Sequence, residues 1–488
     1  MRVSKEEVIA ILAQFNPWWR EETIPDLPTW RRGAFREFYL WLTKPPAPRA
    51  VLLSGARQIG KTTLMLQAVE HLLNTGVPAA NILYATFDHP ILKLAGIDAV
   101  LEAWREREPR VNGIEYLLLD EAQFIRDWGT WVKHQVDFRK ERRIAFTGSA
   151  MPLVAADQES GVGRWHTIRL TTLSFYEYVQ IKQLSLPELP VLKSLRELFE
   201  WTRSDFYRVS EIAGVYVGHF HEYLIRGGFP QTAQVESISQ GQKLLREDII
   251  DKVLKRDMTA LFGVRNVLDL EHTFLYLCMH DGGLLDMTDL CSNLEVKRPT
   301  AQNYIGLLEA THLIYRLPPF GYGKDVLRGK FKVYLADAAI APAVMLKGKT
   351  ILEDATALGV ATETAVFKHL FARYYPQNVR FSYWRGKKGR EVDIVAEVNG
   401  EIIPFEVKYR AQHKGPAELK GLMELCDQKQ IARGYVVTKS MGDFGVMENM
   451  SKRSDNSGHA TDLMRIPATL LCYWLGAIEL YAVTDGSV

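Results

Sequence analysis

The sequence VLLSGARQIGKTT, residues 51–63, is the stretch that decides the fold of this chain. Its apolar start at residues 51–53 is typical of a buried strand, and a helical pattern of apolar residues follows the stretch. Between the two, Gly55 to Thr62 match G-x-x-x-x-G-K-[ST] at every fixed position. A strand, a glycine-rich loop and a helix in this order predict a site where backbone N–H groups and the helix dipole bind phosphate.

The motif gives each part of this loop a role. We expect the Lys61 ammonium to reach the β- and γ-phosphates of ATP, and the Thr62 hydroxyl to be a ligand of Mg²⁺. The residues predicted to bind the nucleotide are Gly55, Ala56, Arg57, Gln58, Ile59, Gly60, Lys61, Thr62 and Thr63.

Further strands are expected at residues 82–85, 116–121 and 143–147. Their alternation with helical segments predicts a parallel sheet covered by helices, with the ligand at the carboxyl ends of the strands. The strand at 116–121 ends in Asp120 and Glu121. We expect Asp120 to hold the magnesium shell and Glu121 to orient or deprotonate the attacking water. Strands often end in acids, so the pair is informative because of its distance after the glycine loop.

Two features that follow the sheet have two interpretations each. The hydroxyls of Thr147 and Ser149 either sense the γ-phosphate or hold the attacking water, or they belong to a simple turn. Arg164 either neutralises the charge that develops on the phosphate, in its own or a neighbouring subunit, or is a surface arginine. We take Arg164 as a catalytic candidate, and action in a neighbouring subunit would require a homo-oligomer.

Length and composition describe an ordinary globular chain. Its 488 residues allow about three domains at ~150 residues each. A net charge of +2 neither requires nor excludes a polyanionic partner. The cysteines, Cys278, Cys291, Cys426 and Cys472, lack C-x-x-C spacing, which favours a reducing cytoplasm over a disulfide framework or a zinc site. The apolar run at 466–483 contains Pro467 and Glu479, so we expect core strands there and no membrane span.

The middle of the chain predicts helices and a helix-turn-helix. Residues 176–265 read as a helical lid or adaptor, and residues 266–330 as a winged helix with a tight connection at Glu295-Val296 and a wing strand at 314–317. If this module reads DNA, Arg298 lies at the N-terminal end of the recognition helix, where contacts are made. The alternative is a structural winged helix that joins two domains, because the helix is not strongly basic.

A second group of chemical residues lies near the C-terminus. A strand at 381–384, a strand at 391–396 and a returning strand at 402–408 can bring Asp393, Glu406 and Lys408 to one end of a hairpin. Two carboxylates with a lysine suit metal-assisted hydrolysis of a phosphodiester, with Asp393 and Glu406 as ligands of Mg²⁺ or Mn²⁺. Glu363, on an upstream helix, can add a further carboxylate. Exposed strand pairs often carry such charges too, so the spacing alone is a weak signal.

A basic loop separates the first two of these strands. Arg385, Lys387, Lys388 and Arg390 would contact the phosphate backbone of a nucleic acid, with Trp384 beside them as a stacking surface.

The segments GARQIGKT, LLLDEAQ, TGSA, LTTLSFYEY and EYLIRGGFP together resemble a family of prokaryotic AAA-like ATPases. Its members continue into a winged helix and a C-terminal domain of unknown function (4143) that is similar to the PD-(D/E)xK restriction-endonuclease fold. The matching segments here are KVYLADAAI, GVATETAVFKHL, YWRGKKGREVDIV and IPFEVKYR, and the resemblance covers most of residues 48–440. It implies an αβα nuclease-like core with Glu363, Asp393, Glu406 and Lys408 as the catalytic set. One departure is Thr172, which stands where the family usually has a proline.

The expected fold class is therefore α/β. We predict an N-terminal extension (1–47), a P-loop ATPase core (48–175), a helical lid (176–265), a winged helix (266–330) and a restriction-endonuclease-like α/β domain (331–488). The predicted function is an ATP-hydrolysing protein that regulates a metal-dependent nuclease acting on DNA, in defence or genome maintenance. The alternative is a nucleotide-driven switch or scaffold whose C-terminal domain binds nucleic acid or a protein partner without cleaving it.

Overall fold

The computed structural model describes residues 3–149, 163–323, 326, 330–386, 389–410, 416–447 and 461–482. The chain divides into two compact units. The first comprises Met1–Leu170 with Ala310–His312, and the second comprises Thr171–Glu309 and Leu313–Val488. Among the described helices, none combines the length and the apolar composition that crossing a bilayer requires.

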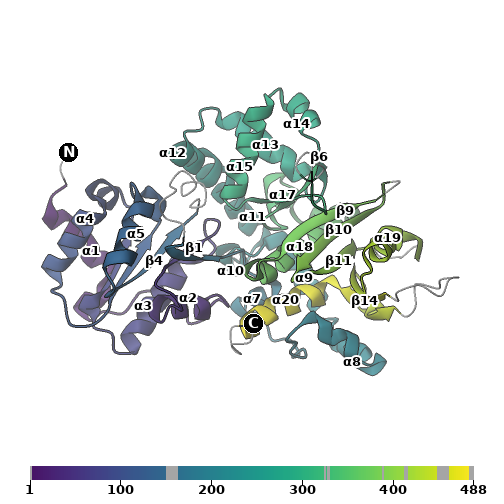
Figure 1. The fold of residues 1–488 in the computed structure, drawn as a ribbon, viewed down its shortest axis with the longest axis horizontal. Helices are drawn as coiled ribbons and strands as arrows, with labels where there is room; N and C mark the ends of the chain where they lie inside the picture. Colours follow the sequence, from purple (N-terminus) through teal and green to yellow (C-terminus); the bar gives the residue numbers. More distant parts are fainter. Residues whose placement is uncertain are drawn as a thin grey trace. The chain divides into compact units, whose positions relative to one another are not determined.

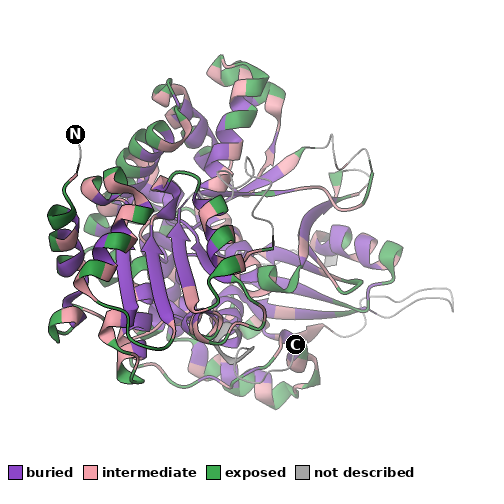
Figure 2. Ribbon diagram, turned by 60° about the vertical axis from the view of Figure 1, so that its left-hand side comes forward, coloured by how far each residue is buried: buried purple, intermediate pink, exposed green. Residues whose placement is uncertain are grey.

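The first unit is built on a parallel sheet with the strand order β2-β3-β4-β1-β5 (Figure 1). Its strands β1, β2 and β3 are buried over nearly their whole length because helices cover the sheet (Figure 2). The predicted parallel α/β core is therefore confirmed. Its elements are α1 (Lys5–Phe15), α2 (Phe35–Thr43), β1 (Ala50–Ser54), α3 (Lys61–Asn74), β2 (Ile82–Thr86), α4 (Pro90–Arg107), β3 (Glu115–Asp120), α5 (Trp128–Phe138), β4 (Arg142–Gly148) and β5 (Trp165–Arg169).

The N-terminal extension belongs to this unit. Val8 and Leu12 of α1 lie in the same apolar core as Leu83 and Leu117 of the sheet. Asn16, which is fully buried, donates to the Tyr84 carbonyl oxygen and accepts from the Tyr84 backbone N–H (2.8 and 2.7 Å). The amide thus satisfies the free edge of β2 as a further strand would.

The second unit begins with helices. They are α7 (Phe175–Ile181), α8 (Arg203–Ala213), α9 (Tyr216–Arg226), α10 (Pro230–Gln234), α11 (Ile238–Glu247), a π-helical turn at Asp248–Asp257, α12 (Met258–Phe262) and α13 (Val267–Met279). The predicted helix-turn-helix follows as α14 (Met287–Leu294) and α15 (Arg298–Ala310). Between these two helices Glu295 adopts a left-handed conformation (φ 53°), which makes the tight connection. Strands β6 (Leu284–Leu285), β8 (Phe331–Leu335) and β7 (Ile314–Leu317) form a small antiparallel sheet beside them, in that order (Figure 1).

A mixed six-stranded sheet completes the second unit, with the order β13-β14-β12-β11-β10-β9. Strands β9 (Arg380–Arg385), β10 (Glu391–Val398) and β11 (Glu401–Lys408) are antiparallel neighbours, and β11, β12 (Arg433–Thr438) and β14 (Asp462–Pro467) are parallel. The remaining elements are α17 (Ile340–Val344), α18 (Ala355–Tyr374), α19 (Lys420–Lys429), β13 (Gly445–Met447) and α20 (Ala468–Ala482).

The apolar run at 466–483 departs from the prediction of core strands. Its first residues end β14, and Ala468–Ala482 form helix α20. A continuous apolar run does not distinguish a buried strand from a buried helix by its period, and here the length of the run favours the helix.

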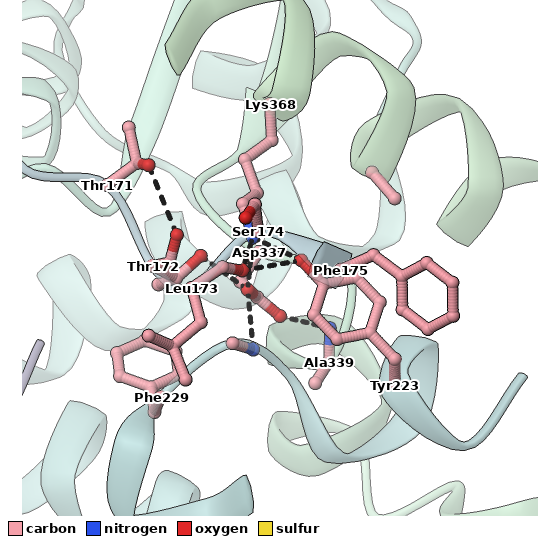
Figure 3. A network of polar contacts seen from close by, with 12 residues as sticks. Thr171, Thr172, Leu173, Ser174, Phe175, Tyr223, Phe229, Asp337, Ala339 and Lys368 are labelled. Atoms are coloured by element: carbon pink, nitrogen blue, oxygen red, sulfur yellow. Dashed lines mark hydrogen bonds and ion pairs between the residues drawn. The ribbon is translucent and has the colours of Figure 1, made fainter. Parts of the chain in front are cut away.

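A buried polar cluster holds the segment that opens the second unit (Figure 3). The Asp337 carboxylate accepts from the Thr172 hydroxyl (2.6 Å) and from the Gly228 N–H (3.0 Å), and it pairs with the Lys368 ammonium (3.5 Å). Lys368 and the Tyr223 hydroxyl both donate to the Leu173 carbonyl oxygen. Thr171–Ser174 pack into this cluster, and the first compact unit ends at Leu170.

Candidate functional site

The glycine loop follows β1 in the first unit, as its sequence predicts. A Cβ atom on Gly55 would lie 2.3 Å from the Leu170 carbonyl oxygen and 2.5 Å from Ile59 Cδ1, so only glycine fits there. Gly60 has φ 91° and caps the N-terminus of α3, which begins at Lys61. These two positions explain why both fixed glycines of the motif are needed.

Lys61 and Thr62 extend from the first turn of α3 toward the loop and β3. The buried Lys61 ammonium donates to the carbonyl oxygens of Gly55 (2.9 Å) and Ala56 (2.8 Å). The Thr62 hydroxyl donates to Asp120 Oδ2 at 2.7 Å. A hydroxyl and a carboxylate that meet at this distance are the oxygen donors that Mg²⁺ prefers next to a bound phosphate.

Asp120 gathers hydroxyl groups from three neighbouring elements. Besides Thr62, Tyr84 donates to Oδ2 (2.9 Å) and Thr147 donates to Oδ1. Asp120 is 3% exposed, so these hydrogen bonds replace the solvent that its carboxylate loses. Burial and the Asp120 charge raise the pKa of the Tyr84 hydroxyl, which stays a donor.

Glu121 adopts a left-handed conformation (φ 53°) directly after β3. Its N–H donates to the Thr147 hydroxyl (2.9 Å), and its Oε2 accepts from the Gln123 amide. Gln123 also donates to the Ser149 hydroxyl (3.3 Å). Thr147 and Ser149 therefore contact the two predicted acids or their immediate partner, while Tyr84 and Gln123 are site residues that no motif indicated.

Arg164 lies at the opposite end of the sheet from the glycine loop. Its carbonyl oxygen accepts from the N–H of Ala50, the first residue of β1, and its Nε pairs with Asp137 Oδ1 at 2.7 Å. The glycine loop follows the other end of this five-residue strand, about 16 Å away at ~3.3 Å per residue. This position does not favour a role of Arg164 at the nucleotide of its own chain, and both the neighbouring-subunit role and the surface-arginine interpretation stay open.

The predicted C-terminal residues meet on β10 and β11 in the second unit. Ile394 pairs with Phe405 across these antiparallel strands, and continuing this register by one residue puts Asp393 opposite Glu406. The Val407 N–H donates to Asp393 Oδ2 at 2.9 Å. Lys408 lies two residues after Glu406, on the same face, and its ammonium pairs with Glu406 Oε1.

Glu363 joins this group from α18. Its Oε1 accepts from the Tyr334 hydroxyl (2.6 Å) and lies 3.4 Å from the Lys332 ammonium, which also contacts Asp393 Oδ1 (3.2 Å). Glu391 completes the surroundings of Lys332 at 2.8 Å. The sequence did not predict three members of this group, which are Lys332, Tyr334 and Glu391. The first two lie on β8, outside the hairpin that carries the motif.

Electrostatics show how closely these carboxylates crowd each other. Burial, followed by the charge of Asp393, raises the pKa of Glu406 to about 8 and that of Glu363 to about 7. Burial lowers the pKa of Lys408, but Glu406 and Asp393 outweigh it and the net shift is upward. The group therefore holds more acidic than basic side chains and favours a cation.

The donor chemistry of this group fits a divalent metal ion. Glu406 is 4% exposed, and its Oε2 is buried without a hydrogen-bond partner. Such an atom is costly unless a cation or a donor satisfies it. Within the described residues, however, no three His, Cys, Asp or Glu side chains are already arranged as a metal site. Lys332 stands among the carboxylates that would form one.

The predicted nucleic-acid contacts have mixed outcomes. Arg385 is exposed at the end of β9, and Arg298 is exposed at the first position of α15. Arg390 is half-buried and pairs with Glu424 at 2.7 Å. Lys387 and Lys388 lie outside the described residues. The stacking role of Trp384 is wrong, because this side chain is 7% exposed and packs with Val392 and Leu422 in an apolar core.

Comparisons with known proteins divide the chain into three matching regions. Residues 47–179 match the model of an AAA domain. Residues 217–350 match a domain of unknown function (DUF8612), and residues 358–452 match another, DUF4143. The first unit is accordingly a P-loop AAA-like ATPase domain, as its parallel sheet and glycine loop indicate.

Full-length relatives are similar over most of the chain. An uncharacterized protein of Haemophilus influenzae is 25% identical over 370 residues, which cover 73% of this chain and 82% of the relative. The uncharacterized protein MJ1637 of Methanocaldococcus jannaschii is 24% identical over 398 residues, or 79% and 80% of the two chains.

Similar solved structures come from AAA-type proteins at low overall scores. The Aeropyrum pernix ORC1 protein in complex with DNA is 14% identical and covers 66% of this chain and 95% of that chain, with a TM-score of 0.29. The replication initiator DnaA bound to AMPPCP and single-stranded DNA is 16% identical and covers 57% and 85%, with a TM-score of 0.23.

Proposed function

We propose that this protein hydrolyses ATP in its first unit and uses the nucleotide to control a metal-dependent site that cleaves DNA in its second unit. The observation that carries the proposal is the convergence of Glu363, Asp393, Glu406 and Lys408 on one buried group. Structural carboxylates are normally solvated or paired one to one. A buried group in which burial and the charge of Asp393 raise the pKa of both Glu363 and Glu406 is typical of a functional site.

Each side chain of the ATP site has a proposed role. Lys61 and the loop N–H groups bind the phosphates, while Thr62 and Asp120 hold Mg²⁺. Glu121 accepts a proton from the attacking water, and Gln123, which is hydrogen-bonded to it, fixes its direction. Arg164 completes the site only in a homo-oligomer, where it would serve the nucleotide of a neighbouring copy.

The roles at the second site follow from the same contacts. Asp393 and Glu406 would hold Mg²⁺ or Mn²⁺, which supplies an activated water and stabilises charge on the phosphate. Glu363 extends the carboxylate set, and the Lys408 ammonium stabilises the negative charge that develops during hydrolysis. The order α18-β9-β10-β11-α19-β12 supports a restriction-endonuclease-like core for these residues. Arg385, Arg390 and Arg298 would contact the DNA phosphates.

The proposal is tested by incubating the protein with single- and double-stranded DNA and RNA, with Mn²⁺ and ATP. The wild type should cleave DNA, and Lys408→Ala and Glu406→Gln should each lose at least a hundredfold in rate. Lys420→Ala removes an exposed lysine at the start of α19 and should cleave normally. Cleavage that survives Lys408→Ala would contradict the assignment of the site.

A second candidate function is favoured by one observation. Lys332 already supplies a positive charge to Glu363, Glu391 and Asp393, so the group is stable as a structural or binding element without catalysis. In this case the chain would be a nucleotide-driven switch whose second unit binds nucleic acid or a protein partner. Binding of DNA in a mobility-shift assay without cleavage of any nucleic acid would favour this function.

A further inference from the structure

Lys332 is an unpredicted cation inside the proposed metal site. Its side chain is 4% exposed, and its ammonium lies 2.8 Å from Glu391, 3.2 Å from Asp393 and 3.4 Å from Glu363. It therefore contacts two of the four residues proposed as catalytic. Lys408 is a separate feature, since its ammonium pairs with Glu406.

A different part of the fold holds Lys332 in place. Its backbone lies in β8, where it is paired with Leu284 of β6 on one side and with Leu317 of β7 on the other. These strands flank the helix-turn-helix of α14 and α15 in the sequence. The carboxylates, in contrast, come from α18 and β10. The small β6-β8-β7 sheet thus supplies the cation, and α18 and the six-stranded sheet supply the carboxylates that bind it.

We propose that Lys332 is a built-in counter-ion that competes with a divalent metal ion for Asp393 and Glu363, so that the metal binds when the ammonium leaves. This inference rests on the proposed function, because it takes these carboxylates as metal ligands. It adds a regulatory step to that function: an ammonium of the chain itself offsets part of the negative charge of the resting site, and loading of the metal is coupled to the position of β8.

Competition follows from the distances. An ammonium nitrogen binds a carboxylate oxygen at about 2.8 Å, whereas Mg²⁺ requires about 2.1 Å to the same oxygen. Two cations that share these oxygens would be only about 4 Å apart in a buried site, where like charges repel strongly. The orphaned Glu406 Oε2 remains available to a metal ion in either state.

Movement of the β6-β8-β7 sheet can drive this exchange. Any change that shifts β8, such as engagement of α15 with DNA, moves the backbone that carries Lys332. Because the Lys332 side chain is buried, a small displacement of the strand breaks contacts that no water replaces. Metal would then load preferentially when DNA is bound at α15, which would protect other DNA from cleavage.

The test compares Mn²⁺ affinity, measured by electron paramagnetic resonance of free Mn²⁺, between the full-length wild type and Lys332→Met. The variant keeps the length of the side chain and removes its charge, and it should bind Mn²⁺ at least tenfold more tightly. Lys330→Met is the matched control, since its ammonium pairs with Asp286 away from the carboxylates and is 54% exposed. Equal or weaker binding by Lys332→Met would overturn the inference.

A measurement on the wild type covers the case in which Lys332→Met does not fold. Amine-specific labelling followed by peptide mass spectrometry should modify Lys332 slowly in the metal-free protein and at least fivefold faster with Mn²⁺. A labelling rate that Mn²⁺ does not change would contradict the exchange. In Glu406→Gln, Mn²⁺ should increase the labelling rate of Lys332 less than it does in the wild type.

These outcomes separate the inference from the proposed function. Mn²⁺ binding that is tighter in Lys332→Met, together with no cleavage of DNA in any variant, would support the counter-ion and contradict the nuclease. Cleavage by the wild type with unchanged Mn²⁺ affinity in Lys332→Met would support the nuclease and contradict the counter-ion.

Discussion

Among the residues proposed for the ATP site, Glu121 has the most specific proposed role. Its left-handed backbone, its N–H bond to Thr147 and its contact with Gln123 fix the carboxylate beside Asp120. Glu121→Gln keeps the size and the hydrogen-bonding capacity of the side chain but removes the base. We expect ATP binding to stay within about threefold of the wild type, while hydrolysis falls about 10²–10⁴-fold.

Phosphate release and binding of a fluorescent ATP analogue measure the two effects separately. Glu108→Gln, on a residue outside the site at the end of α4, is a matched control and should hydrolyse ATP normally. Turnover by Glu121→Gln at the wild-type rate would remove Glu121 from its assigned role.

Asp281 makes stability depend on pH at the level of one residue. Burial raises the pKa of its carboxyl from 3.8 to about 7, although the Leu335 N–H and the Thr364 hydroxyl bond to it. Between these pH values the folded protein keeps a proton that the unfolded chain has lost, so the free energy of unfolding falls as pH rises. Asp281→Asn cannot ionise and should not lose this part of the stability.

Urea unfolding at pH 4.5 and pH 8 checks this expectation. Relative to the wild type, Asp281→Asn should have a higher unfolding free energy at pH 8 than at pH 4.5. The expected increase is about 1.4 kcal/mol for each unit of pKa shift. A difference that is the same at both pH values would show that Asp281 is already ionised in the folded protein at pH 4.5.

Sequence predicts site residues well where a motif fixes both spacing and local geometry. A strand, a tight loop and a helix fix the positions of four residues that meet in the structure, Gly55, Lys61, Thr62 and Asp120. The role of Lys332 could not be predicted from the sequence, because Lys332 contacts Asp393 only through the packing of two sheets. Its neighbourhood in the sequence, an apolar strand, carries no trace of that contact.

At the level of elements, the buried cluster around Asp337 joins segments that are far apart in the sequence. Thr172, Gly228 and Lys368 all bond to this carboxylate, and Lys368 is 1% exposed. The segments LTTLSFYEY, EYLIRGGFP, KVYLADAAI and GVATETAVFKHL thus share a structural reason for their composition. Thr172 is more than a replacement for proline, because its hydroxyl donates to Asp337 at 2.6 Å, a shorter distance than those of Gly228, Ala339 and Lys368.

Removing the cation from this cluster should be costly. Lys368→Met leaves the Asp337 carboxylate buried without its ion pair, and we expect a loss of about 3–5 kcal/mol in unfolding free energy. Chemical denaturation of both proteins at pH 7 measures the loss. Lys243→Met, at a lysine whose side chain is 77% exposed, should change the free energy by less than about 0.5 kcal/mol. A similarly small effect of Lys368→Met would show that water reaches Asp337.

Element boundaries were predictable where capping and period agree. The connection at Glu295-Val296, the second helix of the helix-turn-helix and the strand at 314–317 lie where the sequence places them. The C-terminal apolar run was not predictable from its period, because its few polar residues hide the helical period of α20, although its length favours a helix. The stacking role of Trp384 failed for a related reason, since exposure of a large aromatic residue is decided by packing.

At the scale of the whole molecule, the chain carries two separate chemical groups in two compact units. The AAA domain is shown for the first unit by its sheet, its loop and its family match. The division of the second unit into a lid, a winged helix and a nuclease-like domain remains a prediction, because all three lie in one compact unit. Arg164 is remote from the glycine loop of its own chain, so its proposed role at a nucleotide depends on a homo-oligomer.

The central claim is that the nucleotide controls the second site, and one measurement tests it most directly. The rate of DNA cleavage with Mn²⁺ is determined with and without ATP for the wild type and for Lys61→Ala, which removes the ammonium from the glycine loop. If the nucleotide controls the second site, ATP changes the wild-type rate at least tenfold and leaves the rate of Lys61→Ala unchanged. Equal rates with and without ATP in a wild type that cleaves DNA would contradict it.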